Sequence, residues 1–317
     1  MKHLAIGPGS LAYFALLGAL NKLWDSGALS DLETLSGSSA GAILCFMIAM
    51  TNFDFGQVLD LSLKVQIRRL KPVIKSLIQS YGLIPRETIR SLIVNVFPED
   101  STITFAQLYK RFPKVVYISA FCVELTQTHY FSVESHPDMP VIDALCMSVA
   151  VPFLFSSFKY GSWHYLDGGS AESSPCGPYL GKPQEDVYIL RIEWKENYEV
   201  SNFSTYIQMI LNSMMKCRYN YDFPTCFVNV GEEDLFDFAA GDSSKQRLFL
   251  LGYREAKAPS TFQKSCMNDR RVCTCPSCKP LEEPPPSLGS HVSPYETLDN
   301  HSADIQTEQD APDPCAP

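Results

Sequence analysis

The sequence lacks any apolar run of the ~18–20 residues that a membrane-spanning helix needs. It is also poor in charge, since 19% of its 317 residues are charged and the net charge is −9. A nucleic-acid-binding protein requires a basic surface, so this balance argues against a nucleic-acid partner. With 45% hydrophobic residues, the chain is nevertheless long and apolar enough to bury a large core.

Cysteine occurs eleven times, but the odd number and the scattered positions do not suggest a disulfide framework. Six of the cysteines lie in apolar or mixed sequence, namely Cys45, Cys122, Cys146, Cys176, Cys217 and Cys226. This pattern is typical of free thiols in a reducing compartment. We therefore expect a cytoplasmic protein, with association to membranes left open.

Residues 259–317 lack the apolar periodicity of a folded domain and hold ten of the 22 prolines. They carry four basic and nine acidic residues. We predict a disordered acidic tail, with an unknown partner, after a folded domain of residues 1–258. Four tail cysteines (Cys266, Cys273, Cys275 and Cys278) would suffice for one zinc ion. Their spacing is not that of standard zinc knuckles, so no metal is assigned.

Strand and helix signals alternate through the first 258 residues. We predict strands at residues 3–6, 114–123, 187–194 and 226–230, and a further short strand that ends at Leu35. We predict helices at residues 10–27, 40–50, 84–97 and 243–258. This alternation predicts an α/β fold with a mostly parallel sheet covered by helices.

The segment Leu61–Gly82 contains five basic residues and no acidic one. Such a stretch suits either an anionic membrane surface or a solvated helical face broken by Pro72. We favour the solvated face at this stage.

The stretch "LSGSSAGAI" contains the pattern G-x-S-x-G, with Gly37, Ser39 and Gly41 at the fixed positions. Such a pattern belongs on a tight turn from strand to helix, where flanking glycines relieve crowding around an exposed serine. A helix N-terminus at that point would favour a developing alkoxide or oxyanion. The alternative is a Gly/Ser cap leading into a buried helix.

A nucleophilic serine needs a base, and histidine is scarce where a catalytic triad would need it. After His164 the only histidines, His291 and His301, lie in the predicted tail. A carboxylate could serve the serine directly, and the best candidate is Asp167 in "HYLDGGS". Gly168 and Gly169 follow it and leave room beside the carboxylate. The alternative is a hairpin turn, for which Asp-Gly is a common signal.

A third turn occurs at Gly7-Pro8-Gly9-Ser10, where a strand leads into a helix. Such a loop can aim backbone N–H groups at an oxyanion or a phosphate. It has neither the G-x-G-x-x-G pattern nor a P-loop lysine, so nucleotide binding is not expected. We call residues Gly7–Ser10 the glycine loop and residues Gly37–Gly41 the elbow.

The glycine loop, G-x-S-x-G and Asp-Gly-Gly, in that order, resemble the patatin-like phospholipases. Further similar segments are "TITFAQLYKRF", "VIDALCMSVAVPFLFSSF" and "LFLLGYREA", so the resemblance covers about residues 3–257. It implies a three-layer α/β/α fold and an acyl hydrolase that acts on phospholipid or another lipid ester at a membrane surface. It also implies that no metal or other cofactor takes part.

The resemblance implies that Ser39 is the nucleophile and Asp167 the base, with backbone N–H groups of Gly7, Gly9 and Ser10 forming the oxyanion hole. Gly37, Gly41, Gly168 and Gly169 are the motif glycines. The chain departs from the family in its glycine loop, which lacks the usual basic residue, and in having serine where an asparagine usually precedes Pro175. The expected function is a phospholipase A-type or general acyl-ester hydrolase. The alternatives are a lipid-binding pseudoenzyme and an interaction protein that acts through its tail.

Overall fold

The computed structural model describes residues 1–65, 71–193, 221–231 and 240–257, together with Val200, Tyr206, Met209 and Ile210. The predicted tail and its cysteines lie outside the described residues, as do Cys217 and the two arginines of the basic segment.

The described strands form an eight-stranded sheet with the order β10-β9-β1-β2-β4-β8-β7, in which β5 also pairs with β4. The first five of these run parallel: β10 (Thr225–Asn229), β9 (Val187–Glu193), β1 (His3–Ile6), β2 (Thr34–Ser38) and β4 (Val115–Cys122). Three antiparallel strands complete it: β5 (Gln127–Phe131), β7 (Phe158–Tyr160) and β8 (Trp163–Asp167). The predicted α/β class with a mostly parallel sheet is confirmed.

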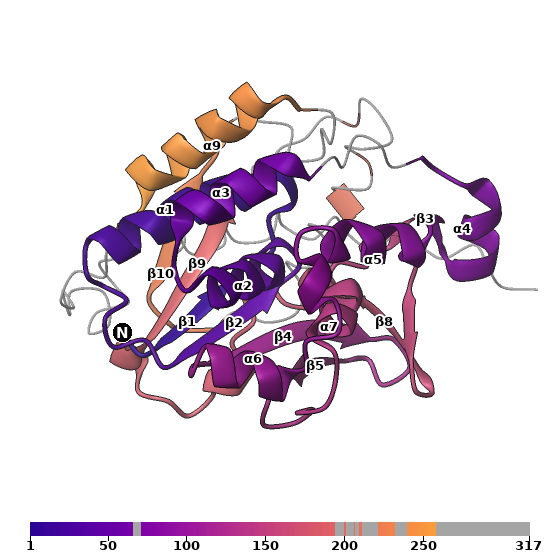
Figure 1. Cartoon of the computed structure of the whole chain (residues 1–317), viewed down its shortest axis with the longest axis horizontal. Helices are drawn as coiled ribbons and strands as arrows, with labels where there is room; N and C mark the ends of the chain where they lie inside the picture. Colours follow the sequence, from indigo (N-terminus) through magenta and orange to yellow (C-terminus); the bar gives the residue numbers. More distant parts are fainter. Residues whose placement is uncertain are drawn as a thin grey trace, which may run out of the picture. The chain divides into compact units, whose positions relative to one another are not determined.

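Helices cover the sheet through one large apolar core (Figure 1). They are α1 (Tyr13–Asp25), α2 (Ala40–Thr51), α3 (Phe55–Lys64), α5 (Arg86–Val94), α6 (Phe105–Arg111), α7 (Val141–Ser148) and α9 (Asp242–Glu255). Alternation along β1 sends Leu4 and Ile6 into this core, while Ala5 joins Cys176 and Tyr179 in a smaller cluster. The sheet is therefore apolar on both faces.

Helices α1 and α9 lie side by side although they are far apart in the sequence (Figure 1). They approach so closely that a Cβ on Gly18 would lie 1.9 Å from the Phe249 carbonyl oxygen. The same is true of Gly252 and the Ala15 carbonyl. Glycine is therefore required at both positions, and this contact brings the C-terminal helix back to the first one.

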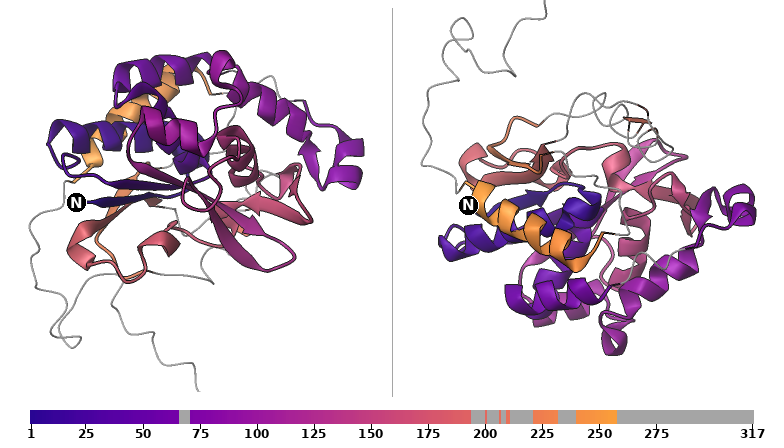
Figure 2. Two further views of the ribbon diagram at one scale, coloured as in Figure 1. Left: turned by 60° about the horizontal axis from the view of Figure 1, so that its bottom comes forward. Right: turned by 90° about the horizontal axis from the view of Figure 1, so that it is seen from above.

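A small unit stands apart from the main sheet, and we call it the appendage. It consists of α4 (Ile74–Ser80) and the parallel pair β3 (Gly82–Ile84) and β6 (Phe153–Phe155). In Figure 1 and in both views of Figure 2, α4 lies at the outer edge of the ribbon.

Two local predictions need correction. The second strand does not end at Leu35 but continues to Ser38, because its parallel pairing with β4 extends to Ser38 opposite Ser119. The first helix opens with a 3₁₀ turn over Ser10–Ala12 before its α-helical part. The prediction of free thiols is confirmed for the five described cysteines, all of which are buried and unpaired.

Candidate active site

Ser39 lies at the sharp turn between β2, which ends at Ser38, and α2, which begins at Ala40. Its backbone has φ 53° and ψ −119°, a conformation that costs a non-glycine residue about 1–3 kcal/mol. The flanking glycines permit the turn. A Cβ on Gly37 would lie 2.5 Å from the Gly41 carbonyl oxygen, and one on Gly41 would lie 2.2 Å from that of Ile6. The predicted elbow is therefore present.

The strand β4 brings Ser39 and Asp167 together. Its first half pairs with β2 up to Ser38 opposite Ser119, and the next residue, Ala120, pairs with Asp167 of β8. Because β8 runs antiparallel, β2 and β8 meet end to end along one edge of β4. The Ser39 hydroxyl donates a hydrogen bond of 2.5 Å to the Oδ2 atom of Asp167.

Backbone groups fix the Asp167 carboxyl. The Oδ1 atom of this carboxyl accepts a 2.7 Å hydrogen bond from the Gly169 N–H. The backbone N–H of Asp167 donates to the Ala150 carbonyl at 2.9 Å. A Cβ on Gly168 would lie 2.5 Å from the Ser119 hydroxyl. The residues after Asp167 form a 3₁₀ turn, Gly168–Ser170, so the alternative of a hairpin turn at this Asp-Gly pair is wrong.

Burial shapes the electrostatics of the pair. Asp167 is only 4% exposed, and this desolvation raises the pKa of its carboxyl from 3.8 to about 7, although the bonds from Ser39 and Gly169 oppose the shift. Near neutral pH the group can therefore both accept and return a proton, as a general base needs to do.

The glycine loop lies against the same site. A Cβ on Gly169 would lie 2.8 Å from the ring of Pro8, so the Asp-Gly-Gly segment and the loop are in contact. The Gly7 N–H donates to the Leu190 carbonyl at 2.9 Å and is thus engaged in the sheet. Of the three predicted oxyanion donors, Gly9 and Ser10 have no hydrogen-bond acceptor for their N–H groups among the described residues.

Two residues near the site were not predicted. The Ser148 hydroxyl accepts a 2.9 Å hydrogen bond from the N–H of Ser39 and so holds the elbow from behind. Ser148 belonged to a recognised segment, but nothing in the sequence assigned this contact. Arg191 belongs to β9 and comes directly after Leu190, which pairs with Ile6 at the end of β1. Its guanidinium donates to the Ser173 hydroxyl at 3.0 Å. Burial lowers the pKa of its guanidinium.

No described histidine forms a hydrogen bond with Ser39 or Asp167. His129 contacts the Tyr165 hydroxyl at 2.9 Å, and His164 pairs with Glu124 at 2.6 Å. The described residues contain no group of three or more His, Cys, Asp or Glu side chains that could hold a metal ion. The described site brings together a serine hydroxyl, a carboxyl group and backbone N–H groups.

Comparisons with known proteins extend these observations. A relative from Invertebrate iridescent virus 6, described as a probable lipid hydrolase, is 27% identical over 180 residues, which are 55% of this chain and 61% of that protein. The chain thus spans less than two thirds of that relative. An uncharacterized protein of Acanthamoeba polyphaga mimivirus is 23% identical over 81% of this chain and 93% of its own length.

Among solved structures, VipD from Legionella pneumophila aligns with a TM-score of 0.56 over 80% of this chain and 65% of VipD. At 15% identity this likeness supports the fold alone. The model of the patatin-like phospholipase family matches residues 4–179, more than half of the 317 residues, and this range includes the glycine loop, the elbow and the Asp-Gly-Gly segment. The chain therefore belongs to the patatin-like phospholipase family.

Proposed function

We propose that the chain is a lipid acyl hydrolase that cleaves carboxylic esters of phospholipids or related lipids, with residues 1–258 as its catalytic domain. The observation that carries this proposal is the 2.5 Å hydrogen bond from the strained Ser39 to the buried Asp167 carboxylate. Membership in the family and the viral relative described as a probable lipid hydrolase support the choice of lipid substrates.

In the first half of the reaction, Asp167 accepts the Ser39 proton while the hydroxyl oxygen attacks the ester carbonyl carbon. The oxygen of the tetrahedral intermediate lies at the N-terminus of α2, where the Ala40 N–H and the free N–H groups of Gly9 and Ser10 can stabilise it. The carbon–oxygen bond to the alcohol then breaks, and the alcohol leaves with the proton from Asp167. The acyl group remains on Ser39.

In the second half, Asp167 takes a proton from water, and the hydroxide attacks the acyl-enzyme. The intermediate collapses, the fatty acid leaves, and Ser39 recovers its proton from Asp167. The pKa of about 7 suits both directions of this transfer.

A fluorophosphonate probe, with mapping of the labelled residue, and fatty-acid release from phospholipid vesicles together test the proposal. We expect label on Ser39 alone and release that disappears in Ser39→Ala. Ser36→Ala is the matched control, because Ser36 is a buried serine of β2, the strand that leads to Ser39, and its hydroxyl has no partner in the described part of the chain. The proposal would be refuted if the wild-type protein showed no labelling by the probe and released no fatty acid.

The engaged N–H of Gly7 favours a second candidate, a pseudoenzyme that binds lipid without cleaving it. This candidate predicts vesicle binding by the wild type and by Asp167→Asn to the same extent, with no turnover in either. Turnover that depends on Ser39 would exclude it.

A further inference from the structure

Large apolar side chains are exposed on the appendage. The exposed fractions are 41% for Val73, 74% for Ile74, 77% for Ile78, 60% for Tyr81 and 52% for Phe153. Ile74 and Ile78 are four residues apart and therefore lie on the same side of α4. Exposed apolar groups gathered on one small unit are typical of an interaction surface. We call these five residues the docking patch.

The backbone holds the two aromatic residues of the patch in an unfavourable conformation. Tyr81 has φ 63° and Phe153 has φ 65°, both in the left-handed region that bulky residues avoid. Phe153 pairs with Gly82, the residue after Tyr81, so the two strained positions are neighbours. Tyr81 is the left-handed C-cap of α4 and its ring contacts that of His164 at 6.1 Å, yet both aromatic rings stay largely exposed and offer apolar area to a partner.

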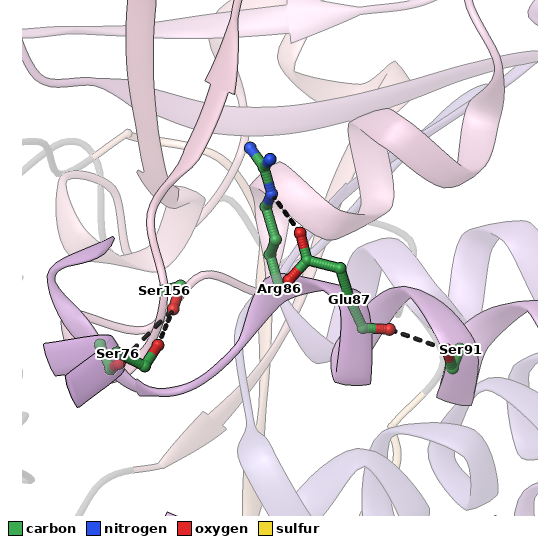
Figure 3. Close-up of polar contacts among 6 residues, drawn as sticks. Ser76, Arg86, Glu87, Ser91 and Ser156 are labelled. Atoms are coloured by element: carbon green, nitrogen blue, oxygen red, sulfur yellow. Dashed lines mark hydrogen bonds and ion pairs between the residues drawn. The ribbon is translucent and has the colours of Figure 1, made fainter. Parts of the chain in front are cut away.

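The segment Leu61–Gly82, which carries four of the five patch residues, bears only positive charge. Lys71 and Lys75 are exposed, and the sequence from Leu61 to Gly82 contains no acidic residue. The next cation, Arg86, pairs with Glu87 at 2.8 Å (Figure 3). A surface that combines exposed isoleucine with lysine is complementary to an anionic lipid interface, and it differs from the solvated polar face favoured on sequence grounds.

Hydrogen bonds and close packing hold the parts of the appendage together. The buried hydroxyls of Ser76 in α4 and Ser156 after β6 form a 3.0 Å hydrogen bond (Figure 3). Backbone bonds of 3.0 Å from Ser156 to Ile84 and from Ser157 to Ser80 close the unit further. A Cβ on Gly82 would lie 2.1 Å from the Phe155 carbonyl carbon, so β3 and β6 are in tight contact. The patch is therefore presented on a fixed support.

The support leads directly to the candidate active site. Ser148 holds the Ser39 N–H, and the Ala150 carbonyl holds the Asp167 N–H. The chain then enters β6 at Phe153, three residues beyond Ala150. Phe153, with its exposed ring, therefore lies only a few residues along the chain from Ser148 and Ala150, whose hydrogen bonds position Ser39 and Asp167.

We propose that the appendage docks the protein on the surface of an anionic phospholipid bilayer. The side chains of the docking patch enter the interface, and Lys71 and Lys75 contact the lipid headgroups. The biological use of this docking rests on the proposed lipid hydrolysis, since it would bring the ester to Ser39. None of the helices in the described part of the chain has the length and apolar character needed to cross a bilayer.

The test uses the full-length chain and sedimentation with two kinds of vesicle, phosphatidylcholine alone and phosphatidylcholine with phosphatidylglycerol. All proteins carry Ser39→Ala so that lipid is not consumed. We expect tighter binding to the anionic vesicles, weakened at least about tenfold by Ile74→Ser with Ile78→Ser. Lys71→Gln with Lys75→Gln should weaken it by about fivefold for each lysine. Leu250→Ser in α9 is the matched control, because Leu250 is 60% exposed and lies outside the patch.

Failure to bind the anionic vesicles, or isoleucine variants that bind as tightly as Leu250→Ser, would overturn the proposal. A dimer in sedimentation velocity that the isoleucine substitutions dissociate would also overturn it, because a second copy would then cover the patch. Hydrolysis of a monomeric short-chain ester, measured with Ser39 intact, tests the proposed function separately. We expect patch variants to retain that rate. A wild type that hydrolyses neither this ester nor vesicle phospholipid refutes the catalytic proposal but leaves the binding result valid.

Discussion

The elbow and the glycine loop are built alike, but different groups reach them. Each follows a parallel strand, leads into a helix and holds a serine in the left-handed region, with φ 53° at Ser39 and 47° at Ser10. The Ser39 hydroxyl donates to a carboxylate, whereas the Ser10 hydroxyl is buried and has no partner among the described residues. The two turns therefore differ in the carboxylate that β8 brings to Ser39, and the proposed roles of the two serines rest on that difference.

We expect the largest effect from substitutions that remove the hydroxyl–carboxylate pair present at the elbow and absent from the glycine loop. Ser39→Ala and Asp167→Asn should each lower kcat/KM about 10⁴-fold, because a member of a catalytic unit is lost. Ser10→Ala keeps the backbone N–H and should cost less than about tenfold. Initial rates on a monomeric ester measure all three. A loss with Ser10→Ala as large as that with Ser39→Ala would contradict the assignment of roles.

The second prediction concerns the stability cost of the carboxylate. Burial raises the pKa of Asp167 to about 7, above its value in the unfolded chain, so the folded state binds the proton more tightly. Stability contributed by this group is complete below the unfolded pKa of about 4 and is lost as the pH rises through 7. Asp167→Asn should therefore raise the free energy of unfolding at pH 8 by up to about 4 kcal/mol, with little change at pH 4.

Urea denaturation at the two pH values measures this effect. Ser39→Ala is the control, since it removes the hydrogen bond but leaves the buried charge and should give no such gain. If Asp167→Asn were no more stable than the wild type at pH 8, then burial of the Asp167 charge would not lower the stability of the folded protein.

A third prediction contrasts the glycines of the two turns. A Cβ on Gly41 would lie 2.2 Å from the backbone carbonyl oxygen of Ile6, which cannot move without shifting β1. A Cβ on Gly9 would meet the flexible end of Leu16 at 3.0 Å. Gly41→Ala should therefore cost about 3 kcal/mol and Gly9→Ala about 1 kcal/mol in denaturant unfolding. Equal costs would mean that the two turns are equally constrained.

The sequence was sufficient for the elbow, because G-x-S-x-G, a preceding strand and a following helix are all local signals. It also pointed to Asp167, through the glycines after it and the lack of a usable histidine. It could not reveal that β2 and β8 meet end to end on β4, since the pairing of Ser38 with Ser119 and of Asp167 with Ala120 is a long-range property. For the same reason the sequence could not predict the hydrogen bond from the Gly7 N–H to the Leu190 carbonyl.

The fourth prediction uses the same pKa for catalysis. Asp167 must be ionised to accept the Ser39 proton, so kcat/KM should fall about tenfold for each pH unit below about 7 and level off above it. A pH–rate profile on a neutral, monomeric ester measures this without changing the substrate charge. A flat profile between pH 5 and 8 would rule out a base with this pKa.

The smallest expected effect separates holding the elbow from performing the chemistry. Ser148→Ala leaves the Ser39 N–H without its acceptor, so the elbow loses its support, and kcat should fall about tenfold with KM unchanged. Ser148→Thr keeps the hydroxyl and should restore most of the rate. Ser132→Ala is the matched control, because the buried Ser132 hydroxyl likewise accepts a backbone N–H, from Glu134 at 3.1 Å. Both alanine variants should lose similar stability, and only Ser148→Ala should lose rate. Equal rates in the two would mean that Ser148 stabilises the fold without positioning the nucleophile.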